Sequence, residues 1–200
     1  MNAPRNLTGR QMSVVDVEQL VDSQTFDVVV VGAGAAGLAA ALFAAIDGAR
    51  VLIVERTEYV GGTSALSGGT TWVPGTRHAA PGDSLTNAAG YLDRAIGERA
   101  PRALRDALLA NGPRAIATLE ANSDVAFRAY PRHPDYLSAI EGSTVAGRAL
   151  EPLPFDGRKL GSLFALVRPP IPEFTVLGGM TLRFSARSQR LRASILRGIP

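Results

Sequence analysis

A glycine-rich turn between two apolar runs constrains this 200-residue chain more than any other feature. Residues 26–31 and 50–54 are rich in Val and Ile, and continuous runs of this kind predict strands buried on both faces of a parallel sheet. Residues 34–47 are rich in Ala and Leu and are followed by Gly48, which predicts a helix and its C-terminal glycine. A strand, a Gly-rich turn, a helix and a strand within about 30 residues make one βαβ unit of an α/β fold. We expect its crossover to be right-handed.

The turn reads Gly-Ala-Gly-Ala-Ala-Gly, a spacing typical of a helix N-terminus that meets a nucleotide pyrophosphate. Gly32 permits the tight turn, Gly34 lets the backbone approach the pyrophosphate, and Gly37 lets the helix pack close to the strand. Glu55 ends the second strand 18 residues after Gly37, where an acid accepts hydrogen bonds from an adenosine ribose and disfavours the additional phosphate of NADP. The predicted dinucleotide-binding residues are Gly32, Ala33, Gly34, Ala35, Ala36, Gly37 and Glu55. A plain βαβ turn without a nucleotide is the alternative.

A segment of small and hydroxyl-bearing residues follows, and it favours FAD over NAD. Residues 57–82 are rich in Gly, Ser, Thr and Pro, and a loop of this length is uncommon unless it is functional. An NAD-binding unit would normally enter another crossover helix here, whereas a flavin needs small residues and backbone N–H groups along its edge. The residues predicted to line the flavin are Gly62, Thr63, Ser64, Ser67, Gly68 and Gly69. A flexible surface loop is the alternative interpretation.

Beyond this segment the sequence predicts three helices and one short strand. The helices are expected at residues 84–97, 101–110 and 113–122, because Pro101 and Pro113 suit first helical positions and a glycine separates the last two helices. The strand is expected at residues 125–128. Residues 129–172 are punctuated by Pro and Gly, and their pattern predicts no regular element.

Several longer motifs resemble the flavoproteins of the fumarate reductase/succinate dehydrogenase superfamily, and among these the 3-ketosteroid Δ1-dehydrogenase group most closely. The strand ending Val54-Glu55-Arg56 and the element Ser67-Gly68-Gly69 followed by Trp72-Val73-Pro74 carry this resemblance, together with the Gly-rich turn. It extends more loosely through Phe127-Arg128-Ala129-Tyr130-Pro131, Asp135-Tyr136 and the segment from Pro152 to Arg158.

The resemblance implies a Rossmann-like α/β FAD-binding domain (a βαβ unit of the GR2 type) with a helical insertion, and it adds Arg56 to the cofactor-binding residues. In that family the flavin takes a hydride from a steroid ring carbon while a tyrosine removes a proton from the neighbouring carbon. By motif position Tyr130 corresponds to a tyrosine that supports this base, with Tyr136 as its nearby competitor. Phe127 corresponds to a residue of the steroid pocket, and Ser67 to one near flavin and substrate. The implied substrate is a small molecule of the steroid class.

The distribution of charge argues against a nucleic-acid partner. The net charge is +3, yet residues 181–200 hold five Arg and no acid, while the other 180 residues hold 16 basic and 18 acidic side chains. The basic excess therefore belongs to the tail, for which binding to RNA, DNA or anionic lipid is the alternative interpretation.

Other functional classes are excluded by residue content. The chain has no cysteine, so disulfides and thiol catalysis are absent. Its two histidines, His78 and His133, fall in unrelated loops without an acidic cluster, which predicts solvated side chains and no metal site. No apolar run reaches the roughly 18–20 residues that span a bilayer, and the first residues lack a signal-peptide pattern. We therefore expect a cytoplasmic chain.

The sequence predicts three regions: a polar leader at residues 1–25 with a short helix at 14–21, a family-like segment at 26–180, and a basic tail at 181–200. An acid-free, Arg-rich end is what a shifted reading frame would produce, so we hypothesise that the tail is not family sequence and that the domain is incomplete. A parallel sheet needs cover on both faces, and its hydrophobic side chains are then expected to stay partly exposed. Three interpretations remain: a flavin dehydrogenase acting on a ring substrate, an NAD-binding reductase, and a non-catalytic fragment or protein-interaction module. For the first, the alternatives are an inactive FAD-binding fragment and a fumarate reductase-like flavoprotein with another substrate.

Overall fold

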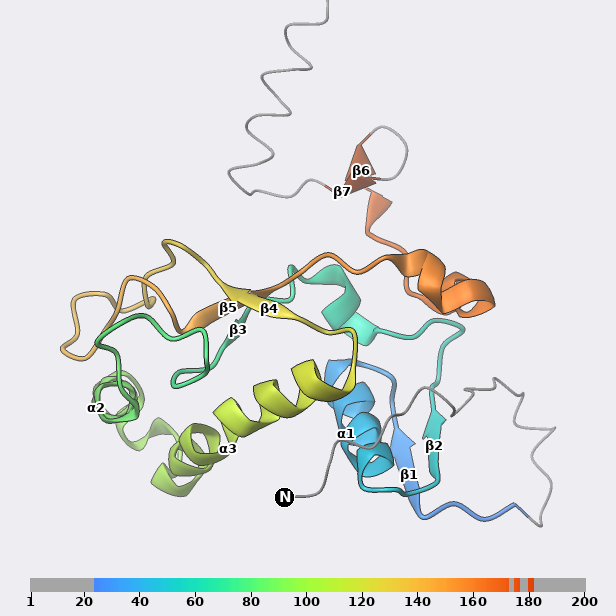
Figure 1. Cartoon of the computed structure of the whole chain (residues 1–200), viewed down its shortest axis with the longest axis horizontal. Coiled ribbons are helices and arrows are strands. Elements are labelled where there is room, and N and C mark those ends of the chain that lie inside the picture. The colour runs from blue at the N-terminus through green and yellow to red at the C-terminus, as the bar shows by residue number, and fades with distance from the viewer. Residues whose placement is uncertain (1–23, 173–174, 177–179, 182–200) are drawn as a thin grey trace, which may run out of the picture. The chain divides into compact units, whose positions relative to one another are not determined.

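The computed structural model describes residues 24–172, 175–176 and 180–181 (Figure 1). The helix predicted at residues 14–21 and all but the first residue of the predicted basic tail lie outside these residues. The chain divides into two compact units. The first is built mainly from residues 69–159, and the second mainly from residues 26–45, 50–68 and 160 onward.

The second unit contains the predicted βαβ arrangement. Strand β1 (Val28–Val31), helix α1 (Ala35–Ile46) and strand β2 (Val51–Val54) follow one another, and β1 and β2 pair in parallel from Val28 opposite Val51 to Val31 opposite Val54. Gly48 has a φ of +100°, the left-handed conformation that a glycine provides after a helix. The α/β fold class and the βαβ unit are thus confirmed.

The prediction that strand β1 is buried on both faces is wrong. Its side chains alternate between half-buried and exposed, with Val29 56% and Val31 84% exposed. Successive side chains of a strand point to opposite faces, and the face that carries Val30 lies toward α1, since a Cβ on Gly37 would lie 3.3 Å from Cγ1 of Val30. Partial exposure of the hydrophobic strand residues, which the sequence also predicts, is confirmed.

The loop predicted at residues 57–82 contains regular structure. A 3-10 helix, η2 (Gly62–Leu66), and a short strand, β3 (Thr71–Trp72), interrupt it. Within the second unit, Val60 pairs in parallel with Val167, which directly follows a longer 3-10 segment, η4 (Gly157–Leu166). Strands β6 (Thr175–Val176) and β7 (Met180–Thr181) form an antiparallel pair.

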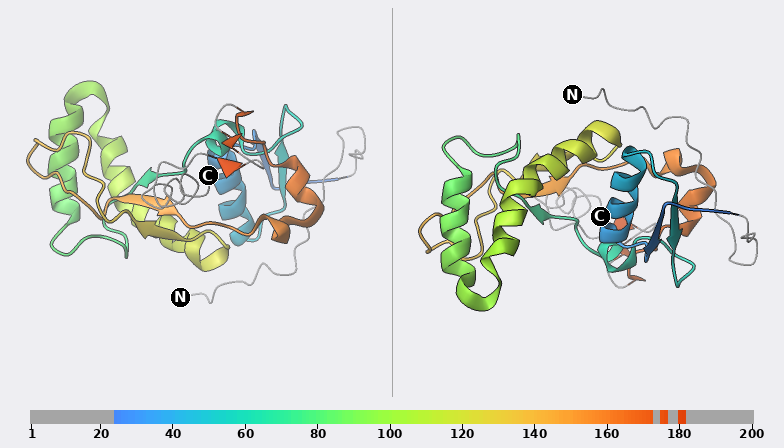
Figure 2. Two further views of the ribbon diagram at one scale, coloured as in Figure 1. Left: turned by 90° about the horizontal axis from the view of Figure 1, so that it is seen from above. Right: turned by 90° about the horizontal axis from the view of Figure 1, so that it is seen from below.

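The first unit packs two helices and a small sheet (Figure 2). Helix α2 (Leu85–Ile96) continues through η3 (Gly97–Arg99) to α3 (Arg102–Asn122), and strands β4 (Phe127–Ala129) and β5 (Ala149–Pro152) join β3 in the antiparallel order β3-β5-β4. Two buried clusters form its core. They consist of Ala88, Tyr91, Leu92 and Leu109, and of Val73, Ile116 and Leu150.

Helix α3 is continuous where the sequence predicts two helices. Pro113 lies inside it, although proline removes one backbone hydrogen bond and usually ends a helix. The reason lies in the tertiary packing, because Leu109 and Ile116 on either side of Pro113 are buried in the two core clusters. Two further differences concern shorter elements: the strand expected at residues 125–128 is β4, and the segment without predicted structure, residues 129–172, contains β5 and all of η4.

Within the part of the chain that the structure describes, no helix combines the length and apolar character needed to cross a membrane.

Candidate nucleotide-binding site

Two glycines of the turn are required by the conformation of the backbone. Gly32 has a φ of +97°, and its N–H donates to the carbonyl oxygen of Val54 at 2.7 Å. A Cβ on Gly37 would lie 1.9 Å from the carbonyl oxygen of Gly32, so no other residue fits there without movement of the backbone. By contrast, a Cβ on Gly34 would meet nothing within 4 Å. The space beside Gly34 is therefore open to a ligand.

Glu55 ties the turn to the end of β2. Its Oε2 accepts a hydrogen bond from the N–H of Ala33 at 2.8 Å, and its Oε1 accepts from the N–H of Thr57 at 2.9 Å and from the Thr57 hydroxyl at 3.1 Å. The bond from Ala33 and those from Thr57 lower the pKa of Glu55 from its usual 4.5 to about 2. The side chain is therefore an anion at neutral pH. Thr57 was not predicted, although a hydroxyl two residues after a strand-terminal acid is a usable signal.

The first half of the predicted flavin segment lies against the turn. The N–H of Gly61 donates to the carbonyl oxygen of Ala33 at 2.7 Å, and Gly61 forms a parallel bridge with Gly34. Gly62 has a φ of +52°, and a Cβ on it would lie 3.2 Å from the Cα of Gly34. The hydroxyl of Ser64 accepts a long hydrogen bond of 3.4 Å from the N–H of Ala35. The structure thus brings the turn, Glu55 and residues 61–64 together.

The remaining predicted cofactor residues are less closely associated with the turn. Arg56 and Thr63 are exposed, and Ser67 donates its N–H to the carbonyl oxygen of Ser64 at 3.1 Å. Gly68 is the last residue of this stretch in the second unit. Gly69 belongs to the first unit, where it has a φ of +72° beside Pro152. The roles predicted for these residues stay predictions.

The residues around the turn fit the ADP portion of a dinucleotide. The first N–H groups of a helix have no acceptor within the helix, and the helix dipole favours negative charge at that end. Helix α1 carries no acid in its first turn, and the open space at Gly34 gives a diphosphate access to these groups. The Glu55 carboxylate lies at the adjacent strand end, where it can accept hydrogen bonds from ribose hydroxyls.

Tyr130 belongs to the first unit, directly after β4. Its N–H donates to the carbonyl oxygen of Ala149 at 3.1 Å, and its phenol accepts a long hydrogen bond from the Thr70 hydroxyl at 3.5 Å. The ring of His133 lies 5.1 Å from that of Tyr130 and 6.4 Å from that of Tyr136, centroid to centroid. Tyr136 is 94% exposed, so Tyr130 is the better enclosed of the two candidate tyrosines.

Phe127 lies in β4 and packs against the buried cluster that contains Val73, Ile116 and Leu150. In this position it stabilises the core of the first unit. A role in a substrate pocket stays a prediction for Phe127, as it does for Ser67.

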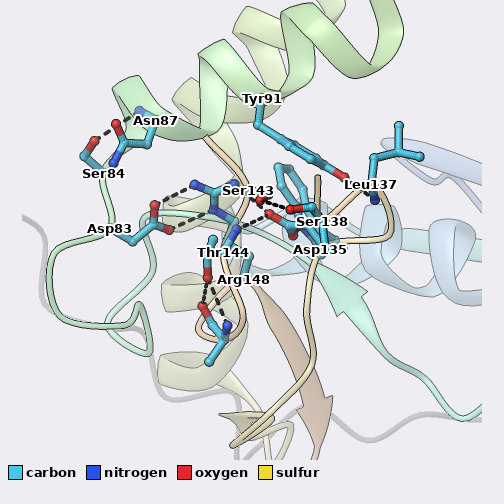
Figure 3. A network of polar contacts seen from close by, with 12 residues as sticks. Asp83, Ser84, Asn87, Tyr91, Asp135, Leu137, Ser138, Ser143, Thr144 and Arg148 are labelled. Carbon is cyan, nitrogen blue, oxygen red and sulfur yellow. Dashed lines mark hydrogen bonds and ion pairs between the residues drawn. The ribbon is translucent and has the colours of Figure 1, made fainter. Parts of the chain in front are cut away.

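A buried ion network holds the loop that follows Tyr130 (Figure 3). Arg148 is 1% exposed and donates to both carboxylate oxygens of Asp83, at 2.8 and 2.6 Å, and to Asp135 at 2.8 Å. Asp135 also accepts from the indole N–H of Trp72 at 2.6 Å and from the N–H of Thr144 at 3.0 Å. The sequence shows these residues only as scattered charges, because their partners lie up to 65 residues apart.

The prediction that His78 is a solvated loop histidine is wrong. Its Nε2 lies 3.0 Å from Oε1 of Glu120, whose side chain is only 7% exposed, and Arg77 approaches the other carboxylate oxygen at 2.9 Å. The N–H of Phe127 donates to Glu120 as well, at 3.1 Å. Burial by itself would raise the pKa of Glu120, but the hydrogen bonds from Arg77, His78 and Phe127 outweigh it and lower that pKa. Glu120 therefore connects α3 to Arg77 and His78, which precede the helix, and to Phe127, which follows it.

Comparison with known proteins defines the class. The family model described as FAD binding domain matches residues 27–193. The chain belongs to this family, and its cofactor is FAD. The match extends past residue 180, where the sequence predicts that the family-like segment ends; the division at that residue stays a prediction.

The individual proteins that are similar to this chain in sequence include dehydrogenases. The chain is 37% identical over 150 residues to the 3-oxosteroid 1-dehydrogenase of Mycolicibacterium smegmatis, which covers 74% of this chain and 26% of the relative. It is 39% identical over 155 residues to the 4-oxocyclohex-2-ene-1-carboxylate 5-dehydrogenase of Sinomonas cyclohexanicum, covering 77% of this chain and 26% of the relative.

A solved structure gives the same class. The 3-ketosteroid Δ1-dehydrogenase of Sterolibacterium denitrificans, in complex with 1,4-androstadiene-3,17-dione, is similar with a TM-score of 0.73 and 31% identity, over 86% of this chain and 33% of that one. The predicted resemblance to the 3-ketosteroid Δ1-dehydrogenase group is confirmed. The chain spans about a quarter of the length of the curated relatives described above.

Proposed function

We propose that this chain carries the nucleotide-binding portion of an FAD-dependent dehydrogenase that removes a hydride and a proton from adjacent carbons of a cyclic ketone, with a 3-ketosteroid as the first candidate substrate. The observation that carries the proposal is the joined arrangement of the Gly-rich turn, the anionic Glu55 and residues 61–64 in a chain of an FAD-binding family.

The names of the relatives support the substrate class. A 3-oxosteroid 1-dehydrogenase, a 4-oxocyclohex-2-ene-1-carboxylate 5-dehydrogenase and a 4-oxocyclohexanecarboxylate 2-dehydrogenase share an oxo group on a ring and dehydrogenation at a ring carbon. A carbonyl group acidifies the C–H bonds beside it, so a ring ketone can lose a proton to a base of moderate strength while its neighbouring carbon loses a hydride.

The proposed roles follow from the two units. In the second unit, the N–H groups at the start of α1 bind the pyrophosphate and Glu55 accepts hydrogen bonds from the ribose. Bound FAD supplies the hydride acceptor. In the first unit, the phenol oxygen of Tyr130 accepts a hydrogen bond from the Thr70 hydroxyl at 3.5 Å. Its O–H group is the donor that we propose supports the base that deprotonates the substrate. Ser67 and Phe127 are the proposed substrate contacts.

Two alternative functions predict different results in a binding experiment. An inactive FAD-binding fragment, or a fumarate reductase-like flavoprotein with another substrate, would bind FAD without being reduced by ring ketones. An NAD-binding reductase would bind NAD in preference to FAD. A cytoplasmic location and the absence of a nucleic-acid partner remain predictions from the sequence.

The test uses the 200-residue chain titrated with FAD and with NAD, followed by anaerobic addition of a 3-ketosteroid or of 4-oxocyclohexanecarboxylate. We expect FAD to bind and its visible absorption band to bleach with one of these ketones. Binding without bleaching by either ketone would preserve the FAD site and remove the dehydrogenase assignment from this chain. Preference for NAD would overturn the flavin site itself.

A further inference from the structure

Glu55 is connected to a second segment of the chain through Thr57. The guanidinium Nη2 of Arg168 donates to the Thr57 hydroxyl oxygen at 3.1 Å, across 111 residues of sequence. The Thr57 hydroxyl lies 3.1 Å from Oε1 of Glu55, and the Thr57 N–H also donates to that oxygen. Arg168, Thr57 and Glu55 therefore form one chain of hydrogen bonds within the second unit.

The donors around Thr57 restrict the orientation of its hydroxyl group. A hydroxyl has one hydrogen to donate and two lone pairs to accept with. Arg168 and the N–H of Tyr59, at 3.1 and 3.3 Å, occupy the accepting side. The hydrogen is left to be donated to Glu55 at 3.1 Å or to the carbonyl oxygen of Tyr59 at 2.9 Å. A cation donating to the oxygen also polarises the O–H bond, which strengthens its donation to a carboxylate.

The backbone holds Arg168 at this place. Its N–H donates to the carbonyl oxygen of Val60 at 2.9 Å, and the N–H of Val60 donates to the carbonyl oxygen of Leu166 at 2.7 Å. The guanidinium carbon lies 5.8 Å from the centre of the Tyr59 ring, a cation–π distance. These contacts limit the freedom of a long side chain, so little further ordering is needed for it to hold Thr57.

From this geometry we infer that Arg168 is a positioning residue of the nucleotide site: acting through Thr57, it holds the Glu55 carboxylate in the orientation that receives the adenosine ribose. The inference rests on the proposed function for the role of Glu55. It makes the segment after η4 part of the cofactor site, although that segment lies more than a hundred residues beyond the Gly-rich turn.

The first test measures the pKa of the Glu55 carboxyl group by carbon-detected NMR titration of the full chain without ligand. Thr57→Val removes the hydroxyl at nearly constant shape and Thr57→Ser retains it, while Arg168→Ala removes the cation. We expect the pKa of Glu55 to rise above about 2 in the Val and Ala variants, to stay below its usual value because the N–H groups of Ala33 and Thr57 still donate to it, and to be unchanged in the Ser variant. An unchanged pKa in Arg168→Ala would overturn the inference, and Arg168→Met, which removes the cation but keeps a long unbranched side chain, serves the same purpose should the Ala variant not fold.

The second test measures FAD affinity in a double-mutant cycle with Arg168→Ala and Glu55→Gln. Loss of one hydrogen bond corresponds to a roughly three- to tenfold weaker affinity. If Arg168 acts through Glu55, the double variant binds FAD no more weakly than Glu55→Gln alone. Independent, multiplying losses would overturn the inference. Arg158→Ala is the matched control, because this arginine is 90% exposed and pairs only with the nearby Asp156 among the described residues.

The two tests separate the possible failures. A chain that binds no FAD at all would contradict the proposed function, while the NMR titration would still show whether Arg168 controls the Glu55 carboxylate. A chain that binds FAD normally with an uncoupled Arg168 would contradict only the positioning role.

Discussion

At the scale of single residues, the glycines of the turn serve different purposes. Gly37 is required by packing, because any Cβ there would collide with the backbone of Gly32. Gly34 has open space around it, so packing does not explain why a glycine stands there. The proposed approach of a pyrophosphate would explain it, and this difference makes stability and binding separable by mutation.

Gly37→Ala is expected to destabilise the chain by about 1–3 kcal/mol or more, since the backbone has to move to accept the methyl group. Gly34→Ala is expected to change stability by less than about 0.5 kcal/mol. It should nevertheless weaken FAD binding at least about tenfold, which corresponds to about 1.4 kcal/mol. Urea unfolding and FAD titration of both variants test this pair. Equal effects of the two substitutions on stability would contradict it.

The lowered pKa of Glu55 predicts a dependence of stability on pH. The folded chain holds this pKa at about 2, below the usual 4.5, so the unfolded chain binds more protons between these values. The stability contributed by the Glu55 anion is complete above about pH 4.5 and is lost as the pH falls toward about 2. Glu55→Gln should therefore be less stable than the wild type at neutral pH, with the difference vanishing on acidification. Unfolding curves from pH 2 to 7 measure this, and a difference that grows toward low pH would refute it.

At the scale of elements, sequence patterns predicted the helices and strands whose formation depends mainly on neighbouring residues. The βαβ unit was predictable because two apolar runs, a glycine turn and an Ala-rich helix agree with one another at every level. Strand β5 was not, since it exists by pairing with β3 and β4 rather than by its own pattern. Helix α3 was split in the prediction because Pro113 is a strong local signal, which packing of the helix overrides.

The substitution Pro113→Ala tests whether packing of α3 overrides the local preference of proline against a helix. Alanine restores an N–H donor inside a helix that is already formed, and proline costs about 3 kcal/mol relative to alanine in a helix interior. We expect the variant to be stabilised by about 1–3 kcal/mol, measured as a raised urea midpoint. Arg114→Ala, at an exposed position of the same helix, is the control and should have little effect. A destabilised Pro113→Ala chain would show that the helix depends on the proline.

The Arg148 network predicts a large effect on stability. Burial by itself would raise the pKa of Asp83, but the hydrogen bonds from Arg148 and Ser84 outweigh it, and that pKa is lowered. Arg148→Met leaves Asp83 and Asp135 buried without their cation, and loss of one partner of a buried ion pair costs about 3–5 kcal/mol. Arg158→Met, at an exposed ion pair, should cost less than about 1 kcal/mol. Similar urea midpoints for the two variants would contradict the structural role of the network.

At the scale of the whole molecule, the sequence predicted which residues come together at the candidate site better than it predicted the residues that support them. The positions of Gly32, Gly37, Glu55 and residues 62–64 in one site were predictable from the spacing and the composition of the chain. Thr57 and Arg168, which hold Glu55, depend on a pairing between distant segments that no local pattern encodes. The chain also spans only about a quarter of its curated relatives, and Val29 and Val31 are exposed on β1. The proposed function therefore depends on whether this length of chain holds FAD.

The most direct measurement is the visible spectrum of the purified 200-residue chain after incubation with FAD and removal of free cofactor. We expect a retained flavin band at about one FAD per chain, and a reduced band in Gly34→Ala and Glu55→Gln chains that remain folded. A folded wild-type chain that retains no flavin would contradict it. So would retention that is unaffected by either substitution, because the cofactor would then be held somewhere other than the Gly-rich turn.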